Sequence, residues 1–253
     1  MRVKLQPAFV LHARPYRDTS QILDVLTPEY GRLALVAKGS RRRVRGGSTV
    51  ALLQPFVPLL LSFSGRGEMK TLTGVEIAGP AKAPVGTRLY SGFYLNELLV
   101  RLMHRHDPHP ILFSVYSETV KSLAGDGQVD EALRRFEFNL LRELGFGFEL
   151  ALDGVSGQAV VAEHWYRFDT ECGLVCVDGN EHADVPAFPG NELLAMAGGE
   201  FGQAVRSTAK RLLRQALASH LGDKPLKSRE LFLRRRYDQP QGASPGQIKG
   251  AGQ

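Results

Sequence analysis

The chain has 253 residues, of which 43% are hydrophobic and 23% charged, a composition typical of a globular protein with one large or two small domains. No apolar run approaches the roughly 18 residues that cross a bilayer, and residues 1–4 are not followed by the apolar core of a signal peptide. Two cysteines do not make a disulfide framework, so the sequence predicts a cytoplasmic protein.

The charges are segregated along the chain, and the formal net charge is +6. Residues 1–80 hold 12 Lys and Arg against 5 Asp and Glu, residues 81–205 hold 9 against 18, and residues 206–236 hold 10 against 2. A basic start, an acidic middle and a basic C-terminal segment favour a polyanionic partner at one or both ends of the molecule.

Short β-strands are expected in the first 80 residues. Apolar stretches separated by turn signals occur at 9–11, 22–26, 33–37, 56–63 and 69–75. Pro58 is expected at an edge or a bulge, because proline cannot donate to a strand ladder. Five such strands predict a small barrel or sandwich, and a basic loop after the third strand fits an OB-fold; periodicity alone does not exclude an SH3-like barrel.

The basic loop after the third expected strand is the first candidate site. Five cations lie in a glycine-bounded segment, and since like charges repel, they face water or an anion: Lys38, Arg41, Arg42, Arg43 and Arg45. We predict that they bind the phosphates of a nucleic acid, and that four further cations of the barrel support them: Arg14, Arg17, Arg66 and Lys70. The alternative is a solvated loop without a partner.

Four barrel aromatics are candidates for stacking on bases, namely Phe9, Tyr16, Phe56 and Phe63. For the three Phe residues core packing is the favoured interpretation. Tyr16 lies between Pro15 and Arg17 and is the better stacking candidate.

The pattern changes to helical spacing after a proline-containing linker at 79–84. Apolar residues at helical intervals predict three amphipathic helices, ending near His104, Gly125 and Gly145. They form an α-helical domain over 81–236, interrupted by a small β-hairpin in the region of about 148–188. Further helices are expected at 191–196, at about 203–221 and from Ser228, and the Gly- and Pro-rich stretch 237–253 is expected to be disordered. The fold class is therefore α+β.

Two clusters invite a metal-site interpretation. Cys172 and Cys176, with His164 and His182, contain the residue types of a tetrahedral zinc site, although unligated hairpin cysteines are favoured. His104, His106 and His109 suggest a metal-dependent nuclease or hydrolase as the alternative function. The spacing favours a polar loop, because an Asp directly follows the second His and Pro108 distorts the geometry. No metal or other cofactor is expected.

Several short motifs together resemble one protein family. They are AFVLHARPY at 8–16, LALVAKG at 33–39, LQPF at 53–56, GRGE at 65–68, LYSG at 89–92, YLNELL at 94–99, ALRRFE at 132–137 and KPLKSRELF at 224–232. Their order is similar to that of the bacterial DNA repair and recombination mediator RecO of the gamma-proteobacterial type. The resemblance extends over about residues 7–236.

This resemblance implies an N-terminal OB-fold over 1–80 and a non-enzymatic role in the RecF pathway. Members of the family bind single- and double-stranded DNA and anneal complementary strands coated by single-stranded-DNA-binding protein. With RecR they promote RecA loading. The expected location is the bacterial cytoplasm, with association to the nucleoid during repair.

The resemblance also implies a site in the helical domain for the acidic, Phe-ending tail of the single-stranded-DNA-binding protein. By this resemblance, the tail-binding residues are Arg134 and Arg135, which lie one turn from apolar residues of the same expected helix. The alternative is that these arginines only pair with Glu131 and Glu137. Three more cations form either the other side of the groove or a second DNA surface: Lys210, Arg211 and Arg214.

Overall fold

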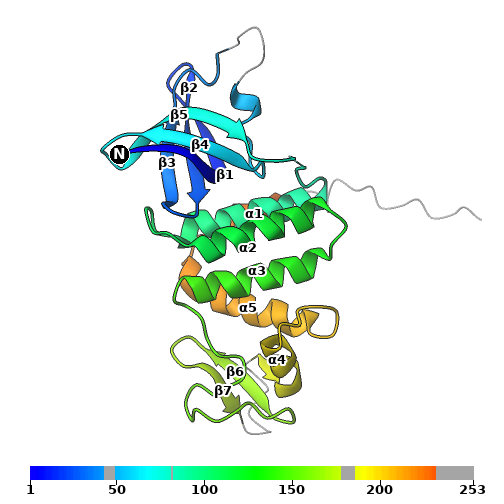
Figure 1. Ribbon diagram of the computed structural model, residues 1–253. Coiled ribbons are helices and arrows are strands. Elements are labelled where there is room, and N and C mark those ends of the chain that lie inside the picture. Colours follow the sequence, from blue (N-terminus) through cyan, green and yellow to red (C-terminus); the bar gives the residue numbers. More distant parts are fainter. Residues whose placement is uncertain (43–48, 81, 178–185, 232–253) are drawn as a thin grey trace, which may run out of the picture.

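A computed structural model describes residues 1–42, 49–80, 82–177 and 186–231 of the protein. A β-barrel lies at one end of an elongated molecule, a layered group of helices lies in the middle, and a small sheet with a short helix lies at the other end (Figure 1). The order of elements confirms the predicted α+β fold.

The barrel is closed and has five strands, in the order β1-β2-β3-β5-β4. Only the β3–β5 pair is parallel. This is the topology of an OB-fold, as predicted. The strands are β1 (Arg2–Tyr16), β2 (Ser20–Thr27), β3 (Gly31–Ala37), β4 (Leu59–Ser64) and β5 (Met69–Ile77), and the short helix η1 (Thr49–Ala51) precedes β4.

The barrel interior follows the alternation seen in the sequence. Leu23, Val25, Leu35 and Phe63 are each completely buried and belong to one cluster. The fourth strand begins three residues later than expected, directly after Pro58, because proline has no N–H to donate to the ladder. We propose a domain division at residue 80, since β5 ends at Ile77 and the next helix begins at Thr87.

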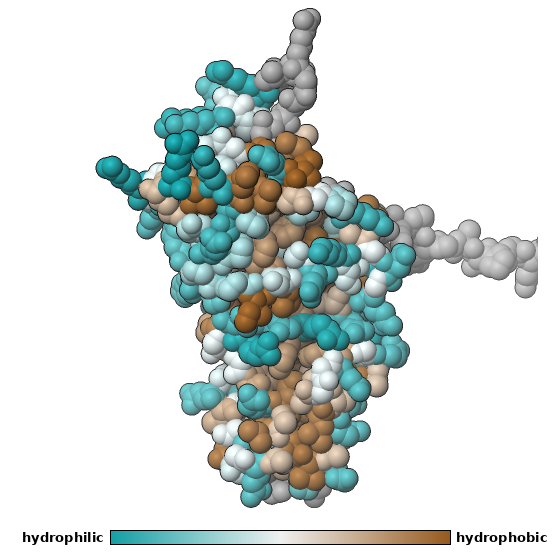
Figure 2. Space-filling view, viewed as in Figure 1, coloured by the Kyte–Doolittle hydropathy of each residue, from teal (hydrophilic) through white to brown (hydrophobic). Residues whose placement is uncertain are grey.

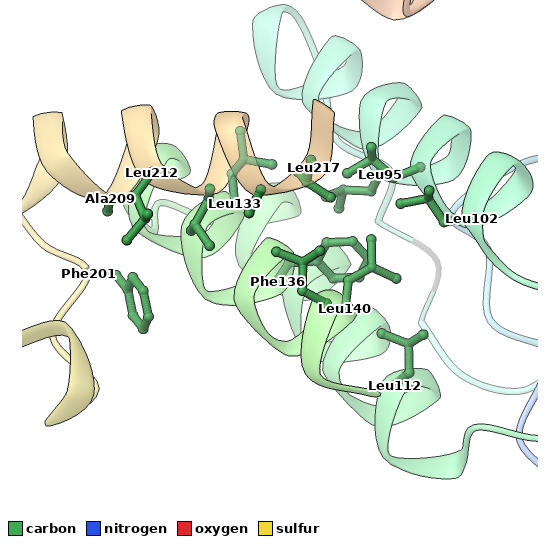
Figure 3. Packing of buried hydrophobic residues seen from close by; sticks show 14 of the residues in the cluster. Leu95, Leu102, Leu112, Leu133, Phe136, Leu140, Phe201, Ala209, Leu212 and Leu217 are labelled. Carbon is green, nitrogen blue, oxygen red and sulfur yellow. The ribbon is translucent and has the colours of Figure 1, made fainter. Parts of the chain in front are cut away.

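The helical part consists of α1 (Thr87–Leu102), α2 (Pro110–Ala124), α3 (Val129–Glu143), α4 (Gly190–Ala197) and α5 (Arg206–Leu221). Leu95, Phe136, Leu140 and Leu212 fill the space between α1, α3 and α5 (Figure 3) and have no exposed surface. The amphipathic spacing in the sequence therefore reported correctly which helix faces turn inward.

The barrel and the helices share apolar and polar contacts. Phe9 of β1 packs against the rings of Phe113 and Tyr116 at centroid distances of 5.6 and 5.1 Å. The Asn96 side chain donates to the Leu11 carbonyl at 2.9 Å and accepts from the Tyr116 hydroxyl at 2.6 Å. These buried hydrogen bonds hold α1 and α2 against β1 in one orientation.

The small sheet contains the predicted hairpin and one additional strand. It has the order β7-β6-β8, with β6 (Trp165–Asp169), β7 (Gly173–Val177) and β8 (Ala187–Pro189). Tyr166 and Leu174 on one face are buried in the same cluster as the helices. This region is therefore packed onto the helical core, and the expected disordered stretch 237–253 lies outside the described residues.

A C-terminal helical turn at 227–231 is attached to α1. The Glu97 carboxylate accepts the backbone N–H groups of Lys227 and Ser228, each at 2.8 Å. Arg101, one turn later on α1, donates to the carbonyls of Leu221 and Pro225. Burial acts to raise the pKa of Glu97, but the hydrogen bonds from Ser228 and Lys227 outweigh it, so the pKa lies below its ordinary value.

Glu97→Gln is expected to destabilise the protein by about 1–2 kcal/mol at neutral pH, because two charge-assisted hydrogen bonds weaken. The folded-state pKa is depressed, so the stabilisation is present above the unfolded pKa of about 4.3 and is lost as pH falls through the folded-state pKa. Urea unfolding at neutral and acidic pH measures the effect, with Glu118→Gln on the exposed side of α2 as control. If the difference in unfolding free energy between Glu97→Gln and the unmodified protein persisted unchanged at low pH, this role of Glu97 would be contradicted.

Candidate nucleic-acid interface

The end of the barrel remote from the helices carries the first part of the basic loop. The Arg41 N–H donates to the Thr19 carbonyl at 2.9 Å, and the Arg42 N–H donates to the Gly39 carbonyl at 3.0 Å. The first bond holds the start of the β3–β4 connection against the β1–β2 loop, and the second closes a turn within that connection. The side chains of Lys38, Arg41 and Arg42 remain exposed; Arg43 and Arg45 lie outside the described residues.

Two predicted supporting cations lie next to this loop. Arg14 near the end of β1 and Arg17 in the β1–β2 loop are exposed, and the Arg17 guanidinium lies 5.2 Å from the centre of the half-buried Tyr16 ring. Among the described residues, none of the five cations at this end forms an ion pair with a carboxylate. Their charge is therefore available to an anion.

The other two supporting cations are placed differently. Arg66 is exposed in the β4–β5 turn, which contacts the N-terminus through the Gly65 N–H and the Met1 carbonyl at 3.2 Å. Lys70 is only 8% exposed, and its ammonium donates to the Gly67 carbonyl at 2.5 Å. Strand alternation turns Lys70 inward, so the structure does not support its predicted DNA contact.

Three of the four barrel aromatics pack in the core, which was the favoured interpretation for the Phe residues. Phe9, Phe56 and Phe63 are 4%, 3% and 0% exposed and pack in the two hydrophobic clusters, so none can stack on a base. Tyr16 alone of the four retains surface. On the face drawn in Figure 2, hydrophilic side chains gather over the upper end and one side of the barrel.

A second charged cluster lies between α1, α3 and α5. The fully buried Glu137 carboxylate pairs with Arg134 at 2.5 Å and accepts the Tyr94 hydroxyl at 2.7 Å. Burial raises the pKa of Glu137, while the charges of Arg134, Arg214 and Arg229 oppose the rise. Burial next to this carboxylate also raises the pKa of Tyr94.

This cluster has more cationic than anionic groups. Arg134 is 7% exposed, and its buried Nε has no acceptor among the described residues. Arg214 on α5 and Arg229 in the C-terminal turn are exposed and act electrostatically on the same carboxylate. Three guanidinium groups around one carboxylate leave a net positive site that suits an acidic group. The hydrogen bonds that Tyr94 and Glu97 form were not predicted from the sequence, because their partners Glu137, Lys227 and Ser228 are far from them in the sequence.

Arg135 points to a different place. It pairs with Glu131 at 3.1 Å, donates to the Gly199 carbonyl at 3.2 Å and lies 5.8 Å from the Phe201 ring centre. These residues line an open pocket of about 290 Å³. The predicted neighbours Arg134 and Arg135 therefore belong to two separate environments, since adjacent helix residues point about 100° apart.

The three predicted cations of α5 also differ from one another. Lys210 and Arg214 are exposed and form no ion pair with a described carboxylate. Arg211 instead donates to the Ala187 carbonyl at 3.3 Å and lies 5.2 Å from the Phe188 ring centre. Arg211 thus attaches α5 to β8 and is not directed toward Glu137.

Neither metal-site interpretation finds support in the described parts of the chain, where no three His, Cys, Asp or Glu side chains converge. His109 pairs with Asp107 at 3.2 Å, and the surrounding loop packs on the barrel through the His106 N–H and the Arg32 carbonyl. Cys172 and Cys176 are unpaired thiols with exposed surface. The Cys176 Sγ lies 3.7 Å from the His164 Nδ1, and His182 lies outside the described residues.

No helix within the described ranges has the length and apolar character needed to cross a membrane.

Comparison with known proteins agrees with this architecture. Residues 1–81 match the model of the Recombination protein O N terminal family, and residues 84–230 match that of the Recombination protein O C terminal family. A DNA repair protein RecO from Nitrosococcus oceani is 49% identical over 92% of this chain and 94% of its own length.

Further relatives with the same description are similar over nearly the whole chain. The protein from Stutzerimonas stutzeri is 45% identical over 90% of this chain and 93% of its own length. That from Haemophilus influenzae is 44% identical over 92% of this chain and 97% of its own length. With both family models matched in order, the chain belongs to the Recombination protein O family.

Proposed function

We propose that the protein acts in recombinational DNA repair as a non-enzymatic mediator that binds DNA and anneals complementary strands. Membership of the Recombination protein O family supports the repair role. The observation that carries DNA binding is the group of exposed cations at the barrel end, none of which is neutralised by a described carboxylate. Annealing brings two polyanions together, and such cations lower the repulsion between them.

In more detail, we propose that the protein acts in the RecF pathway and that its substrate is DNA coated with single-stranded-DNA-binding protein. Cooperation with RecR and promotion of RecA loading are part of this proposal. The acidic tail of the coating protein would bind at the cluster of Arg134, Arg214 and Arg229. Two features support that position: the excess positive charge around Glu137 and the buried Arg134 Nε without an acceptor in the described part of the chain.

An annealing assay with coated and bare complementary strands tests the proposal. The double variant Arg214→Ala/Arg229→Ala is expected to anneal bare strands like the unmodified protein and to lose about 10-fold or more in rate on coated strands, because two charge-assisted contacts to the tail are lost. Titration with an acidic tail peptide ending in Phe should give a similar loss in affinity.

Arg135→Ala is the matched control, because the Arg135 guanidinium is already bound to Glu131 and to the Gly199 carbonyl. It should leave the peptide affinity unchanged. Equal losses for Arg135→Ala and for the Arg214/Arg229 pair would move the tail to the Phe201 pocket. No loss in either variant would exclude both positions.

A further inference from the structure

The loop between α1 and α2 is docked on the barrel. The His106 N–H donates to the Arg32 carbonyl at 3.0 Å, and Arg105 forms a parallel bridge with Arg32 at the start of β3. Gly31 has a φ of +62°, and a Cβ there would lie 1.9 Å from the Asp107 carbonyl oxygen. The loop is therefore held against β3 more closely than any residue but glycine allows.

Two guanidinium groups meet one carboxylate at this junction. Arg105 and Arg32 approach the same oxygen, Oδ1 of Asp24, at 3.5 and 3.7 Å. The Arg105 side chain keeps 43% of its surface exposed, and the Arg32 Nε is buried without an acceptor in the described ranges. One negative charge faces two positive charges, so the junction carries spare positive charge and spare donors.

The junction lies on the same outer face of the barrel as Arg14. Directly opposite residues of neighbouring strands share a face, and the pairs Arg14↔Ile22 and Ile22↔Val36 join β1, β2 and β3 near the loop end. Asp24 is two residues from Ile22 on β2 and so lies on that face, while Leu23 between them is completely buried. The seven residues of β3 give a path of about 20 Å from the basic loop to Arg105.

Burial lowers the pKa of Arg32, Asp24 opposes this effect, and Arg105 adds to it. The cost of burying the Arg32 charge is thus only partly offset by Asp24. An additional anion next to the two guanidinium groups would offset the rest.

We propose that the α1–α2 loop forms the second end of the nucleic-acid surface, with Arg105 and Arg32 contacting phosphates of a single strand that crosses the β1–β2–β3 face. This inference rests on the proposed DNA binding at the barrel end. OB-folds bind strands across strands 2 and 3, so the helical domain here contributes a cation to the barrel's own surface. Asp24 competes with the phosphates for the same guanidinium groups.

Two substitutions with opposite expected effects test the inference. Fluorescence anisotropy with an oligodeoxythymidine of about 30 nucleotides, at several salt concentrations, gives the affinity and its salt dependence. Arg105→Gln is expected to weaken binding about 3- to 10-fold and to lower the salt slope by about 0.7. Asp24→Asn is expected to strengthen binding, because it releases both guanidinium groups.

The charge-matched control is Arg142→Gln, which removes an exposed cation of α3 and should change neither quantity. Unchanged binding in both Arg105→Gln and Asp24→Asn would overturn the inference and leave the loop as a docking element only. Thermal unfolding of Asp24→Asn shows whether the variant is folded. If it is not, the DNA affinity of Arg105→Gln alone tests the inference. If replacing the barrel-end arginines also left binding unchanged, the proposed DNA binding itself would fail.

Discussion

Replacing Arg41, Arg42 and Arg43 together by Ala is expected to lower the affinity for single-stranded DNA on the order of 100-fold at about 0.1 M salt. Arg41 and Arg42 are exposed at the barrel end. Each phosphate contact to a single strand contributes about 0.7 to the salt slope, so three lost contacts should reduce the slope by about 2. A fall in affinity with an unchanged slope would indicate another cause than lost phosphate contacts.

The control removes three exposed cations elsewhere, by Lys121→Ala, Arg142→Ala and Arg167→Ala. Both triple variants lose the same net charge, and therefore a long-range charge effect alone would weaken both equally. We expect the control to bind within about 3-fold of the unmodified protein. DNA binding and annealing of bare strands should be impaired together in the barrel-end variant, in contrast to the selective loss expected for Arg214 and Arg229.

Arg134→Met is expected to destabilise the fold by about 3–5 kcal/mol, because it leaves the fully buried Glu137 carboxylate without its ion-pair partner. The Tyr94 hydroxyl remains as the one hydrogen-bond donor to Glu137 that the structure describes. Equilibrium unfolding in urea measures the loss. The variant's stability should rise as pH falls and Glu137 takes up a proton, since burial already raises its pKa.

The double variant Arg134→Met/Glu137→Gln should recover most of the lost stability, because the neutral amide oxygen still accepts the Tyr94 hydroxyl. Arg135→Met is the control one residue away: its ion pair with Glu131 is exposed, so its cost should stay within about 1 kcal/mol. Equal losses for Arg134→Met and Arg135→Met would contradict the buried ion pair. The double variant is also the suitable protein for testing Arg134 in tail binding without an unstable fold.

Much of the fold could be predicted because periodicity reports which face of an element is buried. The barrel strands, α1 to α3 and the β6–β7 hairpin all overlap the stretches that the apolar pattern indicated, since burial of that face is the main driving force. The bounds differ most for β1, which is longer than expected, and for β4, which begins later. β8 has only three residues and was missed, because so short a segment carries no period. For Phe9, Phe56 and Phe63, the preference for core packing over stacking was confirmed by their burial.

The candidate sites were less predictable, because a charged residue's role depends on partners distant in sequence. Arg134 and Arg135 are neighbours in sequence, but one is buried beside Glu137 and the other is bound at the Phe201 pocket. Lys70 was expected to contact DNA and is instead turned toward the Gly67 carbonyl. No local pattern distinguishes these cases.

The sequence by itself determined that a basic loop follows the third strand of a barrel and that amphipathic helices come after it. Cations close together in the chain repel one another and stay at the surface in any fold that buries the neighbouring apolar strand. Only the tertiary structure decided that Asp24 lies between Arg32 and Arg105, which are 73 positions apart. That arrangement depends on how α1 and α2 pack on the barrel, and the strength of a charge interaction is set by distance and burial, which the order of residues does not contain.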